Sequence, residues 1–194
     1  MEKLLCFLVL ISFFNVFGQT DMHKKAFVFP KESDNSYVSL KAPLKKPLKA
    51  FTVCLHIYSE LALTRSYSIF SYATKKQANE ILIYWSKGRG YLLPVHGTEV
   101  VFRSPENPLA PTHICVSWES DSGIAELWVD GQPMVKSQEK GTSLGTESSI
   151  ILGHDHDSFG GYDKNQSSVG DIGDVNMWDS VLSPEIKFVH SGGT

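Results

Sequence analysis

Short segments in which apolar and polar residues alternate recur along the chain between residues 27 and 178. Alternation with a period of two places every second side chain on the same face of a β-strand. The segments are rich in β-branched and aromatic residues, and glycine, proline and asparagine separate them, which is typical of strands joined by turns. The pattern predicts an all-β fold in which two antiparallel sheets form a jelly-roll sandwich. The predicted strands are Phe27–Phe29, Tyr37–Leu40, Phe51–Tyr58, Tyr67–Tyr72, Ile81–Trp85, Glu99–Phe102, Ile114–Trp118, Ala125–Val129, Ile150–Leu152 and Val175–Trp178.

Two local signals add a hairpin and a short helix to this pattern. Asp130-Gly131 lies between two strand-like runs and predicts a tight hairpin turn, because such a turn needs positive φ angles. Ser183-Pro184-Glu185 predicts a helix start, with a cap, a proline at the first helical position and an acid near the positive end of the dipole. Gly192-Gly193 predicts its end after about two turns. Because a sandwich rarely finishes on a short helix, we expect a truncated C-terminal end and imperfect assembly.

The N-terminal segment has the composition of a secretory signal peptide. Lys3 gives a positive start, Leu4–Phe14 is apolar, and Val16 and Gly18 suit a cleavage site before Gln19. The alternative, an uncleaved membrane anchor, is disfavoured because the apolar run is too short to span a bilayer. The sequence therefore predicts a signal peptide over residues 1–18, one secreted domain over residues 19–194, and no transmembrane anchor.

Charge and cysteine content narrow the function classes further. The net charge of −3 gives no basis for nucleic-acid binding. Cys6 lies in the predicted signal peptide, which leaves Cys54 and Cys115 as an even pair in an oxidising compartment. We expect them to form one disulfide. A catalytic thiol is the alternative, and the position of both cysteines within apolar runs disfavours it.

A short segment rich in carboxylates and glycine, from His154 to Gln166, is the strongest chemical signal in the chain. Calcium prefers six to eight oxygen ligands from carboxylates, amides and carbonyls, and adjacent glycines let a loop curl around an ion. One alternative is a plain solvated turn. Another is a zinc hydrolase site that uses His154 and His156, but the sequence shows no third ligand or general base at a suitable spacing. We therefore do not expect an enzyme.

The run His113-Ile114-Cys115-Val116-Ser117-Trp118-Glu119-Ser120 matches the pattern His-x-Cys-x-Ser/Thr-Trp-x-Ser/Thr of the pentraxin family. Further runs carry the same resemblance, among them Lys25–Asp34, Phe51–His56, Tyr67–Thr74 and Val169–Trp178. The chain thus resembles a short pentraxin from the signal peptide to Gly193. The resemblance implies a lectin-like jelly roll with a Cys54–Cys115 bridge and a homopentamer. It also implies an acute-phase protein of innate immunity that binds phosphocholine on microbial and damaged-cell surfaces through calcium, with complement and Fc receptors on the opposite face.

The resemblance also implies the ligands of two calcium ions per subunit. Ala78 stands where the family has an acid on the first ion, and Asp155 stands where it usually has a glutamate. We therefore expect the first site to be weakened and the second to survive better. His156 matches a position that contributes its backbone carbonyl. The implied calcium ligands are Asn79, Asp155, His156, Asp157, Asp163 and Gln166.

The implied ligand pocket departs from the family pattern at one position. Glu99 matches the acid that faces the choline ammonium, and Tyr84 matches an aromatic residue that packs against the choline methyl groups. Pro94 replaces a small polar residue and narrows or reshapes the pocket floor. The alternative function is a degenerate pentraxin that acts as a structural or scavenging oligomer through protein contacts alone. Asn165-Gln166-Ser167 is a glycosylation sequon, which we expect to be used only if the calcium site is degenerate.

Overall fold

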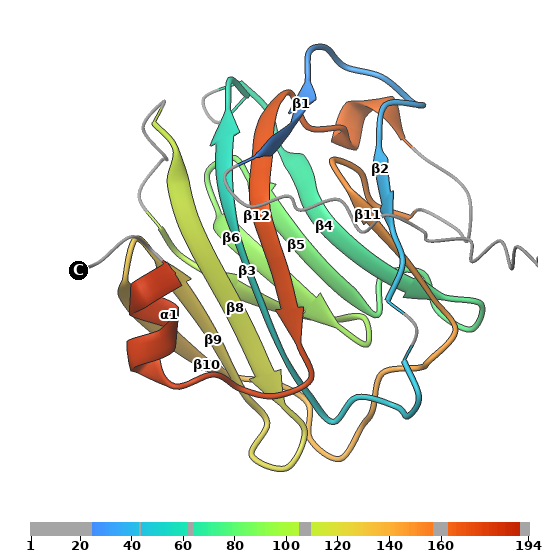
Figure 1. Ribbon diagram of the computed structural model, residues 1–194, viewed down its shortest axis with the longest axis vertical. Coiled ribbons are helices and arrows are strands. Elements are labelled where there is room, and N and C mark those ends of the chain that lie inside the picture. The colour runs from blue at the N-terminus through green and yellow to red at the C-terminus, as the bar shows by residue number, and fades with distance from the viewer. Residues whose placement is uncertain (1–24, 43, 62–63, 105–109, 157–162, 191–194) are drawn as a thin grey trace, which may run out of the picture.

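The computed structural model describes residues 25–42, 44–61, 64–104, 110–156 and 163–190, and within them two six-stranded antiparallel sheets face each other (Figure 1). Sheet A consists of β1 (Ala26–Phe29), β12 (Gly170–Trp178), β3 (Ala50–Ser59), β8 (Thr112–Glu119), β9 (Ile124–Val129) and β10 (Gln132–Ser137), in that order. Sheet B consists of β2 (Val38–Leu40), β11 (Ser148–Leu152), β4 (Tyr67–Thr74), β5 (Ile81–Ser86), β6 (Gly90–Val95) and β7 (Thr98–Phe102). The predicted all-β sandwich is confirmed.

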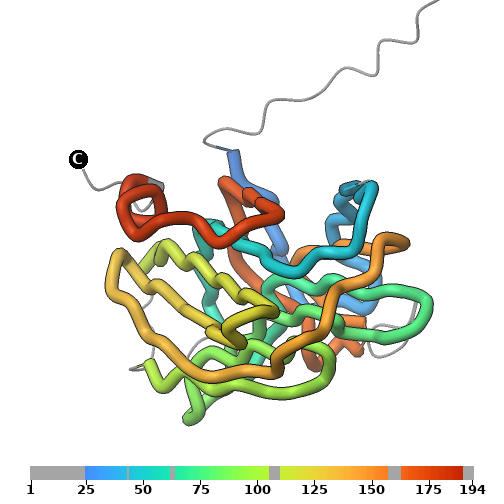
Figure 2. The backbone as a smooth tube through the Cα atoms, turned by 90° about the horizontal axis from the view of Figure 1, so that it is seen from below, coloured from blue at the N-terminus to red at the C-terminus, as the bar shows by residue number. Residues whose placement is uncertain are grey.

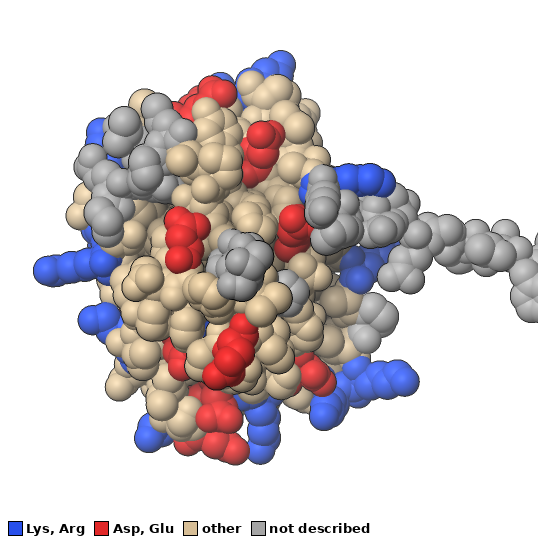
Figure 3. Space-filling view, turned by 60° about the vertical axis from the view of Figure 1, so that its left-hand side comes forward, with Lys and Arg blue, Asp and Glu red and all other residues tan. Residues whose placement is uncertain are grey.

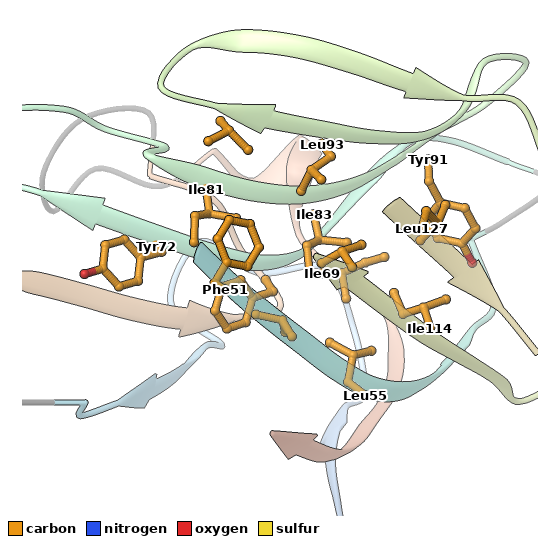
Figure 4. Close-up of a cluster of buried hydrophobic side chains, with 14 of the residues drawn as sticks. Phe51, Leu55, Ile69, Tyr72, Ile81, Ile83, Tyr91, Leu93, Ile114 and Leu127 are labelled. Carbon is orange, nitrogen blue, oxygen red and sulfur yellow. The ribbon is translucent and has the colours of Figure 1, made fainter. Parts of the chain in front are cut away.

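The core lies between the two sheets and is built from the inward side chains of both (Figure 4). Phe51 and Leu55 on β3 and Ile114 on β8 meet Ile83 on β5 and Leu93 on β6, and each is at most 1% exposed. Burial of one such side chain stabilises the fold by about 1.5–3 kcal/mol. The alternation of buried and outward residues thus fixes which side chains are left for the outer faces.

One strand, β6, was not predicted from the sequence. It contains Gly90, the pair Leu92-Leu93 and Pro94, so its pattern has no clean alternation, and proline normally argues against a strand interior. β6 nevertheless pairs with β5 on one side and with β7 on the other. Tertiary pairing therefore overrides the weak local signal at this strand.

The local signals for the hairpin, the helix and the disulfide are confirmed. Asp130 and Gly131 have φ angles of 46° and 79°, and β9 and β10 pair directly across that turn. α1 spans Pro184–His190, and the Lys187 amide donates to the Ser183 carbonyl at 3.1 Å. Cys54 and Cys115 lie opposite each other on β3 and β8 and form a disulfide, which contradicts the catalytic-thiol alternative.

The two outer faces of the sandwich differ. α1 lies on the outer side of sheet A, while the strands of sheet B form the other side of the molecule (Figure 2). On the face shown in Figure 3, acidic side chains are spread over the middle and basic ones lie mainly at the rim. Among the described residues there is no helix with the length and apolarity of a membrane span. The predicted signal peptide, Asp157 and Gly192-Gly193 lie outside the described residues.

Candidate functional site

The three predicted head-group residues share the outer face of sheet B. Ile83, Leu93 and Val100 point into the core, so the alternate positions that carry Tyr84, Pro94 and Glu99 point outward. Their strands, β5, β6 and β7, are consecutive neighbours in the sheet, and Pro94 pairs directly with Glu99. The sheet therefore places all three residues on one surface.

The β4–β5 loop brings Asn79 to the edge of this surface. Asn79 has a φ angle of 48°, a left-handed conformation that asparagine tolerates better than most residues. The next residue, Glu80, is 5% exposed and accepts from the Thr74 hydroxyl and, at 2.7 Å, from the Gly145 amide. These bonds tie down the loop, and the Ser71 hydroxyl lies 3.1 Å from Asn79 Oδ1.

His156 lies beside Asn79, and its ring is held by two serines. Its Nδ1 lies 2.8 Å from Ser71 Oγ and its Nε2 lies 3.2 Å from Ser149 Oγ. The imidazole is 1% exposed, and this burial lowers its pKa. With both ring nitrogens engaged, the backbone carbonyl remains the group that His156 offers to a metal.

The zinc alternative requires His154 and His156 to face one ion, but the hydrogen-bond contacts of the two rings diverge. His154 Nε2 bonds to the Ser33 carbonyl, whereas the His156 ring lies between Ser71 and Ser149. Within the described residues, the cluster of possible metal-binding side chains is Cys54, His113 and Cys115. The two sulfurs of that cluster are joined in the disulfide and are therefore not thiolate ligands.

Asp163 and Gln166 are positioned by a single 3₁₀ turn, η1 (Lys164–Gln166). The Asp163 carboxylate caps the turn and accepts from the Asn165 backbone amide at 2.9 Å. One turn later, the Gln166 side chain reaches Asp155, which is 4% exposed. The segment that follows β11 and the η1 turn thus meet through Asp155 and Gln166.

The contact between Gln166 and Asp155 brings hard oxygens together. If the Gln166 amide oxygen points toward Asp155, it faces the two carboxylate oxygens of Asp155, and all three atoms are hydrogen-bond acceptors. This is unfavourable unless a cation lies between them or the amide turns, in which case its nitrogen donates to Asp155 Oδ1 at 2.6 Å. A buried carboxylate and a side-chain amide this close together can each present an oxygen to a metal, and these are donor types that calcium prefers. The described residues therefore fit the predicted calcium site.

Tyr84 lies between the predicted calcium ligands and the rest of the predicted head-group surface. Burial raises the pKa of its phenol, a hydrogen bond with Ser66 opposes that rise, and the carboxylates of Asp155 and Asp163 add to it. On β4, Ser68 pairs with Tyr84, and the Ser68 carbonyl accepts from the hydroxyl of Ser168, two residues after Gln166. The aromatic surface predicted to receive choline adjoins the predicted calcium ligands.

Glu99 has a partner that the sequence did not reveal. Its Oε1 forms an ion pair with Nη2 of Arg89, which lies in the β5–β6 turn. Ser71, Ser149 and Glu80 were also missed. The outward position of Ser71 on a predicted strand was a signal, but a separation of 85 positions along the chain hides the contact of Ser71 with His156.

Comparison with known proteins identifies the family. The sequence model described as the Pentaxin family matches residues 25–194. The chain belongs to the pentraxin family. This pentraxin is 71% identical to C-reactive protein from Cavia porcellus, over 100% of this chain and 87% of that protein. It is 68% identical to C-reactive protein from Homo sapiens, over 100% of this chain and 88% of that protein. It is 52% identical to serum amyloid P-component from Cavia porcellus, over 99% of this chain and 87% of that protein.

The pentraxin fold is also found among solved structures. The native heptameric SAP-like pentraxin from Limulus polyphemus superposes with a TM-score of 0.72 over 89% of this chain and 84% of that one. At 21% identity, this likeness shows the shared sandwich alone. The high identity to C-reactive proteins supports a recognition protein over a catalyst.

Proposed function

We propose that this pentraxin is a secreted, calcium-dependent pattern-recognition protein of innate immunity. Its ligands are phosphocholine-like head groups on lipids and polysaccharides of microbial or damaged-cell surfaces. The observation that carries the proposal is the approach of the Gln166 amide to the buried Asp155 carboxylate. The same segment reaches the strand beside Tyr84, because the Ser168 hydroxyl donates to the carbonyl of Ser68, which pairs with Tyr84.

The proposed calcium ligands from the described residues are the side chains of Asn79, Asp155, Asp163 and Gln166 and the carbonyl of His156, with Asp157 as a further ligand. Ser71 orients two of these groups, because its hydroxyl contacts both Asn79 Oδ1 and His156 Nδ1. When bound, calcium supplies positive charge that attracts the phosphate of a head group. Because Ala78 offers no oxygen from its side chain, the first of the two sites is the weaker.

The proposed head-group surface combines an aromatic residue, an acid and a rigid ring. Tyr84 is half-buried, and its aromatic face attracts a quaternary ammonium by about 0.5–2 kcal/mol. Glu99 provides negative charge one strand beyond Pro94, and Pro94 sets the floor between them. A trimethylammonium group would thus contact carbon on two sides and a carboxylate on the third.

Family membership extends the proposal to assembly and partners. We expect a homopentamer whose face opposite the calcium site, on sheet A, engages complement and Fc receptors. Asp130 on that side matches a position implied for complement, and its carboxylate accepts from the His113 amide at 2.8 Å.

A second candidate function is a structural or scavenging oligomer that works through protein contacts without calcium. The ion pair between Arg89 and Glu99 favours it, because it compensates the charge that would attract choline. Ala78 and Pro94 favour it as well, since both depart from the family pattern at the metal and at the pocket floor.

Retention on immobilised phosphocholine separates the two functions. We expect the folded protein to be retained in calcium and released by a chelator. Asp155→Asn and Gln166→Ala should abolish retention, while Lys164→Ala, an exposed change on the same 3₁₀ turn, should leave it intact. Passage of folded wild-type protein straight through the column in calcium would reject the calcium-dependent function in favour of the second.

A further inference from the structure

A hollow of about 370 Å³ lies beside the proposed head-group surface and is lined by two arginines. Its walls are Gly88, Arg89, Val101 and Arg103, from the β5–β6 turn and the end of β7. Glu99 and Val101 on β7 and Arg103, the first residue after it, are alternate residues and share the outer face. The hollow is therefore continuous with the surface that carries Glu99 and Pro94.

The backbone holds the two arginine-bearing segments close together. Gly90, directly after Arg89, has a φ angle of 97°, and a side chain there would collide with the Phe102 carbonyl. β6 and β7 pair at Tyr91 and Phe102. Arg89 and Arg103 thus flank a tight strand contact, which places two guanidinium groups at one hollow without a long flexible loop between them.

The charge at the hollow is only partly compensated. Arg89 pairs with Glu99, and both side chains are exposed, at 52% and 39%. The ion pairs among the described residues do not include Arg103. Two guanidinium groups thus line the hollow and one carboxylate pairs with one of them, so the described residues give this end of the face excess positive charge. Arginine also presents a planar fork that suits phosphate oxygens.

The same ion pair changes what the head-group surface favours. A carboxylate already paired with arginine attracts a quaternary ammonium less strongly than a lone one. If a ligand brought a second phosphate, Arg89 could turn from Glu99 to that phosphate, and Arg103 would add to the attraction. Arg89 thus weakens the attraction of the surface for a quaternary ammonium and strengthens its attraction for a ligand with a second phosphate.

We propose that Arg89 and Arg103 form an anion subsite that selects ligands with a second phosphate beyond the calcium-bound one, as in a phosphodiester-linked polymer. The proposal rests on the proposed function, because the first phosphate needs the calcium site. Ser71 on β4 contacts the proposed calcium ligands Asn79 and His156, and β4 is two strand spacings from β6 and three from β7. The two phosphates would therefore be separated by about 10–15 Å. Phosphates two units apart along a short poly(glycerol phosphate) chain can span that separation, so such a chain provides a flexible probe of it.

Calorimetry in calcium with two probes, phosphocholine and a glycerol-phosphate oligomer, tests the subsite. We expect wild type to bind the oligomer more tightly than phosphocholine. Arg89→Ala should weaken oligomer binding about tenfold, the scale of a lost charge-assisted hydrogen bond, and should tighten phosphocholine binding a few-fold. Arg103→Ala should weaken only the oligomer. Lys87→Ala removes an equal charge from the same turn without touching Glu99, and should change neither affinity.

The outcomes distinguish the subsite from the proposed function. Calcium-dependent binding of phosphocholine with equal oligomer affinity in wild type, Arg89→Ala and Lys87→Ala would overturn the subsite and leave the proposed function standing. Absence of calcium-dependent binding of either probe by folded wild type would overturn both. Because Arg89 and Arg103 are exposed, unchanged melting temperatures should accompany every variant. Arg89→Gln gives a second variant that removes the charge but keeps a polar side chain.

Discussion

Lys187 Nζ lies 2.6 Å from Glu126 Oε2, and this ion pair fixes α1 against the outer face of sheet A. The ammonium also donates to Ser117 Oγ at 2.9 Å and lies 5.5 Å from the centre of the Trp128 ring. Its side chain is 1% exposed, whereas that of Glu126 is 26% exposed. The buried Lys187 ammonium therefore depends on its partner for compensation of its charge more than the partly exposed Glu126 carboxylate does.

We predict that Glu126→Gln costs more stability than Lys187→Met. Removing the carboxylate leaves an ammonium buried without a counter-charge, which should cost about 3 kcal/mol. Removing the ammonium leaves a carboxylate that water can reach and that Trp128 Nε1 still contacts at 3.0 Å, so the cost should be about 1 kcal/mol. Urea unfolding measures both, and the double variant should resemble Lys187→Met.

An exposed ion pair supplies the control. Lys75 and Glu147 lie 3.1 Å apart and are 71% and 75% exposed. Glu147→Gln should therefore change the free energy of unfolding by less than about 0.5 kcal/mol. Equal costs for Glu126→Gln and Lys187→Met would show that burial of the ammonium does not govern the pair.

The same pair should make the protein sensitive to acid. Burial raises the pKa of Glu126, but the hydrogen bonds from Lys187 and Trp128 and the charge of Lys187 outweigh it, so the pKa is lowered overall. The folded state then binds fewer protons than the unfolded state at this carboxyl. Its contribution to stability is present above the unfolded pKa, about 4.3, and is lost as the pH falls through the lower folded pKa.

Urea unfolding between pH 6 and pH 3 checks this dependence. The slope of stability against pH below about pH 4.5 should be smaller in the Glu126→Gln/Lys187→Met double variant than in wild type. Identical slopes in the two proteins would assign the acid sensitivity to other carboxyls.

Removal of the Cys54–Cys115 disulfide should destabilise the sandwich without changing its topology. The bridge links residues 61 positions apart, and the chain-entropy model gives a loop of that length about 4 kcal/mol. Because β3 and β8 also pair along their whole length, we expect Cys54→Ala/Cys115→Ala to fold with stability lowered by about 2–4 kcal/mol. An unchanged urea midpoint, with the same dependence on denaturant, would contradict this.

The fold could be predicted where a strand has one buried and one outward face. β3, β5 and β8 carry apolar residues at alternate inward positions, so period and composition were sufficient. β6 could not be predicted, because Pro94 and the leucine pair obscure the period and because its strand state depends on β5 and β7 beside it. Information about such a strand lies in its neighbours, not in its own residues.

The candidate site also contains residues that could be predicted from the sequence and residues that could not. Residue types and family pattern predicted the acids and amides around Asp155, because calcium demands those groups. The pairing of Glu99 with Arg89 could not be predicted, since it depends on how the β5–β6 turn lies over β7. The serine hydroxyls that hold His156 were equally hidden, because β4, β11 and the following segment meet only in three dimensions.

Restoring an acid at Ala78 should strengthen the weaker calcium site. We expect wild type to show one tighter and one weaker calcium-binding event by calorimetry. Ala78→Asp adds a charge and an oxygen next to Asn79, whose side chain is already oriented by Ser71, so the weaker event should tighten about tenfold or more. The tighter event should change little.

A charge-matched variant separates coordination from general attraction. Gln77→Asp adds the same charge one residue earlier, and it should tighten the weaker event by only a small factor, because long-range attraction is screened by water and salt. Two equally tight events in wild type would refute the idea that Ala78 weakens the site. Equal gains from both substitutions would mean that net charge alone, and not an added ligand oxygen, limits calcium affinity in this loop.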